Sequence, residues 1–118
     1  MAVVYNVEID QGADWFFNIT YDQPQGTPVN ITDYTGALQL RSFPADVTAV
    51  LTLTTENDGI TIVGAEGLVE VHATAEQTNA IDAGNYNYDL EITAPITGVV
   101  TRLVQGIASV NAQVTRNG

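Results

Sequence analysis

The fold is decided by the stretch Asp82-Ala83-Gly84-Asn85-Tyr86-Asn87-Tyr88-Asp89-Leu90-Glu91-Ile92. From residue 85 onward, apolar or aromatic side chains alternate with polar ones at a period of two, which is the pattern of a strand with one buried face. The apolar face carries Tyr86, Tyr88, Leu90 and Ile92, and the polar face carries Asn85, Asn87, Asp89 and Glu91. The pattern therefore predicts a central strand of a β-sheet core.

The residues that lead into this strand have the spacing Asp-x-Gly-x-Tyr, with Asp82, Gly84 and Tyr86 at the three named positions. Immunoglobulin-type sandwiches enter one central strand through such a corner, where the tyrosine hydroxyl bonds to the backbone a few residues upstream. Tyr86 resembles that corner tyrosine. Antibody domains carry a cysteine two residues later, whereas Tyr88 stands here, so the resemblance is to the sandwich in general.

Seven to nine short strands are predicted along the chain, because alternating segments are separated by turn-forming residues at fairly even spacing. Alternation marks strands at 3–10, 15–22, 38–41, 48–55, 60–63 and 68–73, and a long last strand is predicted at 99–115. The expected fold is all-β, an antiparallel immunoglobulin-like sandwich that forms one domain over residues 1–118. A small closed barrel is the other architecture that this pattern allows.

One short helical turn is predicted near residues 75–81. The period changes between Thr74 and Ile81, and Thr74-Ala75-Glu76-Gln77 matches a capping box, in which Gln77 reciprocates the backbone hydrogen bond that Thr74 accepts. We expect this turn to cross one end of the sandwich.

The chain of 118 residues has 14 acidic residues, three arginines and no lysine, for a net charge of −11. Nucleic acid and anionic membranes are unlikely partners for such a chain, since binding them depends on neutralising their charge. The absence of cysteine excludes disulfides and thiolate chemistry. No apolar run is long enough to cross a bilayer, and the first residues lack the features of a signal peptide, so no export signal is expected.

Few residues are available for catalysis. His72 is the only histidine, and its position on an alternating strand indicates an ordinary exposed residue. Ser42 and Ser109 do not lie on the Gly-x-Ser-x-Gly turn of a nucleophile. Asp89 and Glu91 project from one face of a strand, but alternate outward carboxylates usually form a solvated surface. We predict no catalytic, cofactor-binding or metal-binding residue, since no loop has the regular spacing of a calcium site.

Four segments resemble small virion proteins of tailed bacteriophages, and in particular the immunoglobulin-like N-terminal domain of the phage baseplate upper protein. The segments are Gly26-Thr27-Pro28-Val29-Asn30-Ile31-Thr32-Asp33-Tyr34-Thr35-Gly36, Leu38-Gln39-Leu40-Arg41, Gly67-Leu68-Val69-Glu70-Val71 and Gly84-Asn85-Tyr86-Asn87-Tyr88-Asp89-Leu90. The closing segments Thr101-Arg102-Leu103-Val104-Gln105-Gly106 and Val114-Thr115-Arg116 are similar to such proteins as well. Asn30 and Asp33-Tyr34 depart from the Asp and Gly of the family pattern.

This resemblance implies a non-enzymatic component of a virion that is assembled in the host cytoplasm. The expected role is an adaptor in the tail, baseplate or neck, in contact with other virion proteins or with further copies of itself. The alternatives are a capsid decoration protein, a glycan-binding module for host adsorption and, least favoured, a small hydrolase that uses Asp89 or Glu91.

The last strand predicts where such contacts form, because both of its faces are partly apolar. Either a bulge at Gly106 exchanges the two faces midway, or another chain covers one face. On the second interpretation, Phe16, Val50, Val100 and Val104 form a subunit interface.

Overall fold

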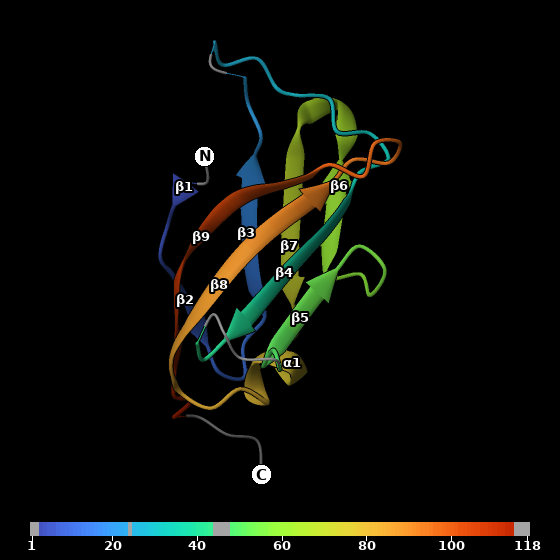
Figure 1. Cartoon of the computed structure of the whole chain (residues 1–118). Helices are drawn as coiled ribbons and strands as arrows, with labels where there is room; N and C mark the ends of the chain where they lie inside the picture. The colour runs from blue at the N-terminus through green and yellow to red at the C-terminus, as the bar shows by residue number, and fades with distance from the viewer. Residues whose placement is uncertain (1–2, 24, 44–47, 115–118) are drawn as a thin grey trace.

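The computed structural model describes residues 3–23, 25–43 and 48–114, which form two packed β-sheets (Figure 1). Within these residues nine strands are present: β1 (Val3–Val4), β2 (Val7–Asp10), β3 (Trp15–Thr20), β4 (Thr35–Arg41), β5 (Leu51–Thr54), β6 (Ile60–Val63), β7 (Leu68–Ala73), β8 (Gly84–Thr93) and β9 (Val100–Asn111). The helical segments of this part of the chain are η1 (Gly64–Glu66) and α1 (Ala75–Asn79). None of the helices among the described residues is long and apolar enough to span a membrane.

The larger sheet has the strand order β1-β9-β8-β4-β5, with β2 also paired to β9, and the smaller sheet has the order β3-β7-β6. Two separate sheets that pack face to face make a sandwich, so the all-β sandwich is confirmed and the closed barrel is wrong. The antiparallel prediction is wrong for β1 and β2, which run parallel to β9. Alternation along one strand reports its buried face and carries no information about the direction of its neighbour.

The core lies between the two sheets, and β8 is central to it, since it pairs with both β9 and β4. All four predicted core side chains of β8 are buried. Aromatic rings add to the core at one side of the sandwich. Phe17 stacks between Trp15 and Tyr5 with ring centroids 5.8 and 5.9 Å away, and it meets the edge of Tyr88 at 6.4 Å. Such rings contribute the largest apolar areas of any side chains.

The tyrosine corner is present as predicted. The hydroxyl of Tyr86 donates a hydrogen bond of 2.6 Å to the backbone carbonyl of Asp82, four residues upstream. Gly84 between them has a φ of +150°, a conformation that residues with side chains rarely adopt. The corner therefore fixes the loop that leads from α1 into β8.

The faces of β9 do exchange midway, but at a different residue from the predicted Gly106. Leu103 and Val104 are both buried, and the pairing with β8 passes from Val104 opposite Leu90 to Arg102 opposite Glu91. Leu103 is therefore the extra residue of a β-bulge, which allows consecutive side chains to point inward. The predicted end of this strand at Thr115 lies outside the described residues.

Gly106 instead allows the N-terminal segment to pass very close to β9. A Cβ at this position would overlap the backbone carbonyl of Tyr5, which passes directly beside it. The same carbonyl accepts a hydrogen bond from the hydroxyl of Tyr88, and Asn6 Oδ1 accepts one of 3.0 Å from Ile107 N. Gly106 thus allows the N-terminal segment to lie against β9 where β1 and β2 are interrupted.

The capping box of α1 is confirmed. Gln77 N donates to Thr74 Oγ1 at 3.2 Å, and Thr74 N donates to Gln77 Oε1 at 2.8 Å. The helix is anchored by Thr78, which is fully buried and donates to the carbonyl of Ala13 at 2.9 Å. It crosses one end of the sandwich as predicted (Figure 1).

Candidate functional site

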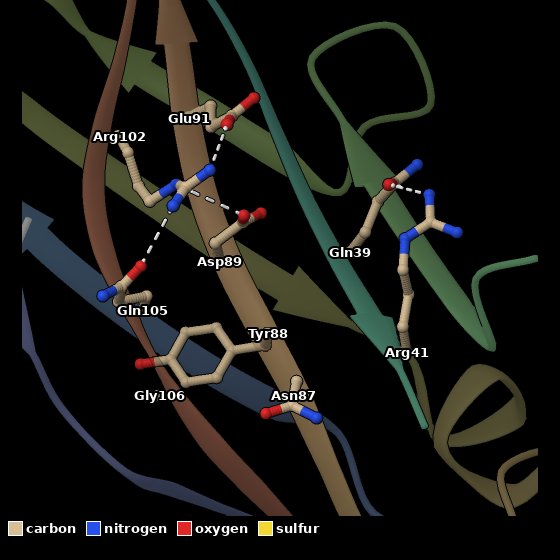
Figure 2. A pocket seen from close by; sticks show the side chains of 9 residues that line it. All are labelled: Gln39, Arg41, Asn87, Tyr88, Asp89, Glu91, Arg102, Gln105 and Gly106. Carbon is tan, nitrogen blue, oxygen red and sulfur yellow. Dashed lines mark hydrogen bonds and ion pairs between the residues drawn. The ribbon is translucent and has the colours of Figure 1, made fainter. Parts of the chain in front are cut away.

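A polar hollow of about 550 Å³ lies on the outer face of the larger sheet (Figure 2). Strands β4, β8 and β9 supply its lining residues: Gln39, Arg41, Asn87, Tyr88, Asp89, Glu91, Arg102, Gln105 and Gly106. Its volume falls within the range of roughly 300–1,000 Å³ that is typical of small-molecule sites. All three strands are paired in one rigid sheet, so the backbone holds the lining side chains in place.

The centre of the hollow is a row of three side chains across neighbouring strands. Asp89 lies opposite Gln39 of β4 on one side and opposite Gln105 of β9 on the other. Directly opposed residues on one face of a sheet have Cβ atoms about 4.5–5.5 Å apart. The register therefore places a carboxylate between two amides.

Two arginines lie at opposite corners around this row. Arg41 lies on β4 opposite Asn87, and Arg102 lies on β9 opposite Glu91. The backbone positions of the two arginines are thus about 13 Å apart along the strand direction, since Asn87 and Glu91 are four positions apart on β8. The hollow holds two arginines and two carboxylates, so its formal charge is zero in a chain whose net charge is −11.

Arg102 organises one side of the hollow. Its Nε lies 3.4 Å from Asp89 Oδ2, and its two terminal nitrogens lie 3.5 Å from Glu91 Oε2 and 3.1 Å from Gln105 Oε1. Arg41 donates a hydrogen bond of 2.7 Å to Gln39 Oε1. Both guanidinium groups therefore bind the carbonyl oxygen of a glutamine. The amide nitrogen of Gln39 donates to Thr52 Oγ1 at 3.5 Å, whereas that of Gln105 has no acceptor among the described residues.

Asp89 is the most perturbed acid of this surface. Burial raises the pKa of its carboxyl above the ordinary value, the charge of Glu91 raises it further, and Arg102 and Arg41 oppose the rise. This carboxylate is ion-paired with Arg102, whose Nε lies 3.4 Å from Asp89 Oδ2. No hydrogen bond to the other oxygen, Oδ1, is present among the described residues, so Oδ1 can accept one from a donor in the hollow.

His72 lies on the other sheet and is half-exposed, as the alternation predicts. Its Nε2 is 2.9 Å from Asp14 Oδ2, and its ring stacks on Phe16 at 4.5 Å with an angle of 6° between the planes. Asp14 Oδ1 also accepts a 2.9 Å hydrogen bond from Ala75 N at the start of α1. The hydrogen bond with His72 and that from Ala75 lower the pKa of the Asp14 carboxyl.

The four residues of the predicted subunit interface do not form one surface. Val104 is fully buried in the core, so its assignment to an interface is wrong; the bulge at Leu103 turns Val104 inward. Phe16 projects from the smaller sheet, whereas Val50 and Val100 lie at opposite ends of the larger sheet. Phe16, Val50 and Val100 are exposed, as predicted.

Sequence reasoning noted that Asp89 and Glu91 share one face of a strand, but it interpreted them as a solvated surface and missed their partners. One feature of the sequence could have pointed to Arg41 and Arg102. The chain has only three arginines, and these two occupy outward positions on predicted strands. Nothing in the sequence shows that those two positions line the same hollow as Asp89 and Glu91.

In the part of the chain that the structure describes, no group of three or more potential metal ligands comes together. A scan of protein-family models and a search of curated proteins returned no match.

Proposed function

We propose that this chain is a non-enzymatic structural component of a bacteriophage virion, an adaptor in the tail, baseplate or neck that mediates protein–protein contacts. The motif resemblance and the sandwich fold both support this role. The observation that carries it is the presence of exposed apolar side chains at both ends of the sandwich, because an adaptor must bind one neighbour at each end.

The first of these surfaces is the hairpin end, formed by Ile96, Val99 and Val100 between β8 and β9. Ile96 is 95% exposed, and the other two are exposed by more than half. From Ile92 to Thr101 the sequence has no charged residue. In a chain of net charge −11, this segment approaches another acidic protein with less repulsion than most of the surface does.

The second surface is the helix end, formed by Phe16, Phe43 and Val50, which are all exposed. Phe16 belongs to this end because it follows Trp15, which pairs with Ala73 just before α1. Val50 belongs to it because its backbone N donates to Leu40 O near the last residue of β4. The opposite end of β4 begins at Thr35, which pairs with Thr93 beside the hairpin end. The two surfaces are thus separated by about 20 Å along β4.

The test is incorporation of variants into particles of the phage that encodes the chain. Val100→Asp and Val50→Asp place a charge at one end each, on side chains that contribute little to the core. We expect each to reduce the number of copies per purified particle by at least about tenfold, since burying an unpaired charge in a contact costs several kcal/mol. Quantitative mass spectrometry of purified particles measures the copy number.

Asn18→Asp is the matched control, because it adds the same charge at an exposed site on the smaller sheet, away from both ends. It should be incorporated at the wild-type level. Both valine variants should keep the wild-type melting temperature, and Asn18→Asp should lower it only slightly, because Asn18 pairs with Glu70 across the strands and like charges there are unfavourable. Absence of the wild-type chain from purified particles would refute the virion assignment. Normal incorporation of both valine variants would instead refute the two-ended contact.

A further inference from the structure

We infer that the polar hollow over Asp89 binds a neutral, hydroxyl-rich ligand, a stretch of one to three sugar units of a neutral polysaccharide. This inference concerns a surface other than the hairpin end and the helix end, and it does not depend on the proposed virion role. It rests on the charge balance of the hollow, on its free hydrogen-bonding groups and on its size.

The charged side chains that line the hollow disfavour the binding of simple ions. Asp89 and Glu91 repel an anion that approaches Arg102, and Arg102 repels a cation that approaches either carboxylate, because the Arg102 guanidinium lies 3.4 Å from Asp89 and 3.5 Å from Glu91. Arg41 adds a second positive charge at the opposite corner. A ligand without formal charge avoids both repulsions, since like charges at such distances are strongly unfavourable in a partly buried site.

The hydrogen-bonding groups in the hollow favour a ligand that carries hydroxyl groups. Asp89 Oδ2 is paired with Arg102, but Asp89 Oδ1 accepts no hydrogen bond among the described residues. Beside it, Gln105 offers an amide nitrogen, because its carbonyl oxygen is already bound to Arg102. On the other side of Asp89, both groups of the Gln39 amide are engaged, the carbonyl by Arg41 and the nitrogen by Thr52 Oγ1. A hydroxyl group donates one hydrogen bond and accepts others, so adjacent hydroxyls can meet a carboxylate and a neighbouring amide together.

The shape of the hollow fits a short segment of a sugar chain. Its volume of about 550 Å³ suits a ligand of drug size, and it lies along the open face of the sheet. The lining contains one aromatic residue, Tyr88, whose ring is buried beneath the surface. Without a ring to stack on, the affinity of one site rests on hydrogen bonds alone, and we expect a Kd of about 1 mM or weaker.

Weak single-site binding is useful where several copies act together. If the chain is present in several copies on a particle, simultaneous engagement raises the apparent affinity for a repeating polysaccharide by about 10²–10⁴. The single-site property is nevertheless measurable on the purified chain in solution, so the two proposals fail independently. Loss of particle incorporation would leave sugar binding intact, and the reverse also holds.

The experiment is a two-dimensional amide NMR titration of the full chain with maltotriose, cellotriose and triacetylchitotriose. We expect at least one of these neutral trisaccharides to shift the amides of Asn87, Asp89 and Gln105 and to leave those of the smaller sheet unchanged. The cationic chitosan trisaccharide and anionic trigalacturonate serve as charge controls, with expected affinities at least about tenfold weaker. A long neutral glucan distinguishes binding of internal units from binding of chain ends.

Two variants test the assignment to the hollow. Gln105→Ala should weaken the trisaccharide about three- to tenfold, the usual effect of one lost hydrogen bond. Asp89→Asn should weaken the neutral sugar by at least as much and strengthen trigalacturonate, because it removes a negative charge and leaves both arginines in place. Asn18→Ala on the smaller sheet should change neither affinity.

Three results would overturn the inference. One is the absence of shifts in the hollow with every neutral trisaccharide at tens of millimolar, about ten times the expected Kd. Another is tighter binding of a charged trisaccharide than of any neutral one. The third is a set of shifts that lies on another surface and survives both Gln105→Ala and Asp89→Asn.

Discussion

The hydroxyl of Tyr86 lies 2.6 Å from the backbone carbonyl oxygen of Asp82 and closes the loop between α1 and β8. Burial raises the pKa of this phenol, and the charge of Asp82 raises it further. The neutral hydroxyl is therefore the form that the folded chain holds, and it connects the loop to the central strand.

Tyr86→Phe removes the hydroxyl and keeps the ring. The carbonyl of Asp82 then loses its partner, and we expect the free energy of unfolding to fall by about 1–2 kcal/mol. Urea denaturation followed by tryptophan fluorescence measures the change. Tyr34→Phe is the control, because no hydrogen bond from its hydroxyl is present among the described residues, and it should alter stability by less than about 0.5 kcal/mol. Equal effects of the two substitutions would contradict a special role for the corner.

Tyr88 should ionise far later than an exposed tyrosine. Burial raises the pKa of its hydroxyl to about 12, and the hydroxyl also donates to the carbonyl of Tyr5. Because the folded pKa lies above the unfolded value, the resulting stability is complete below about pH 10 and is lost as the pH rises toward 12. Absorbance at about 295 nm follows the titration of the phenols.

In the wild-type chain the last phenol should titrate near pH 12, together with alkaline unfolding. In Tyr88→Phe that late step should be missing, and the N-terminal segment should exchange its amide hydrogens faster. A late step that persists in this variant would assign the raised pKa to another tyrosine.

Asp14 should stabilise the fold at neutral pH and lose this effect in acid. Its carboxyl pKa is lowered by the hydrogen bond with His72 and by that from Ala75. A folded pKa below the unfolded value gives stability that is present above about pH 4 and disappears as the pH falls through the folded pKa. Asp14→Asn should therefore lower the melting temperature at pH 6 and have a smaller effect at pH 2.

Glu66→Gln removes a carboxylate from an exposed site without a hydrogen bond to its side chain among the described residues, and it should leave this pH dependence unchanged. A melting temperature that falls equally at both pH values for Asp14→Asn would show that the carboxyl acts through packing and not through its charge.

Val104 and Val100 lie on the same strand, but truncation of Val104 should destabilise the fold much more than truncation of Val100. Val104 is fully buried and Val100 is 56% exposed. Val104→Ala should cost about 2 kcal/mol, because it removes buried methyl groups and leaves a cavity, whereas Val100→Ala should cost less than about 0.5 kcal/mol. Thermal and chemical unfolding of the two variants measure the difference. Similar costs would mean that the faces of β9 do not exchange at Leu103.

Local features of this protein were predictable from the sequence. Alternation identified the core side chains of β8, the spacing of Asp82, Gly84 and Tyr86 indicated the corner, and the sequence from Thr74 to Gln77 indicated the cap of α1. Each of these features depends on side chains and backbone groups only a few residues apart, so the chain carries the whole pattern in one short stretch.

Features that join distant segments were decided by the tertiary structure. The bulge at Leu103, the parallel course of the N-terminal strands along β9 and the meeting of Arg102 with Asp89 all depend on strand register. A shift of one residue would turn every side chain of a strand to the other face. The packing of both sheets selects that register as a whole, and so the hollow exists only once β4, β8 and β9 are aligned.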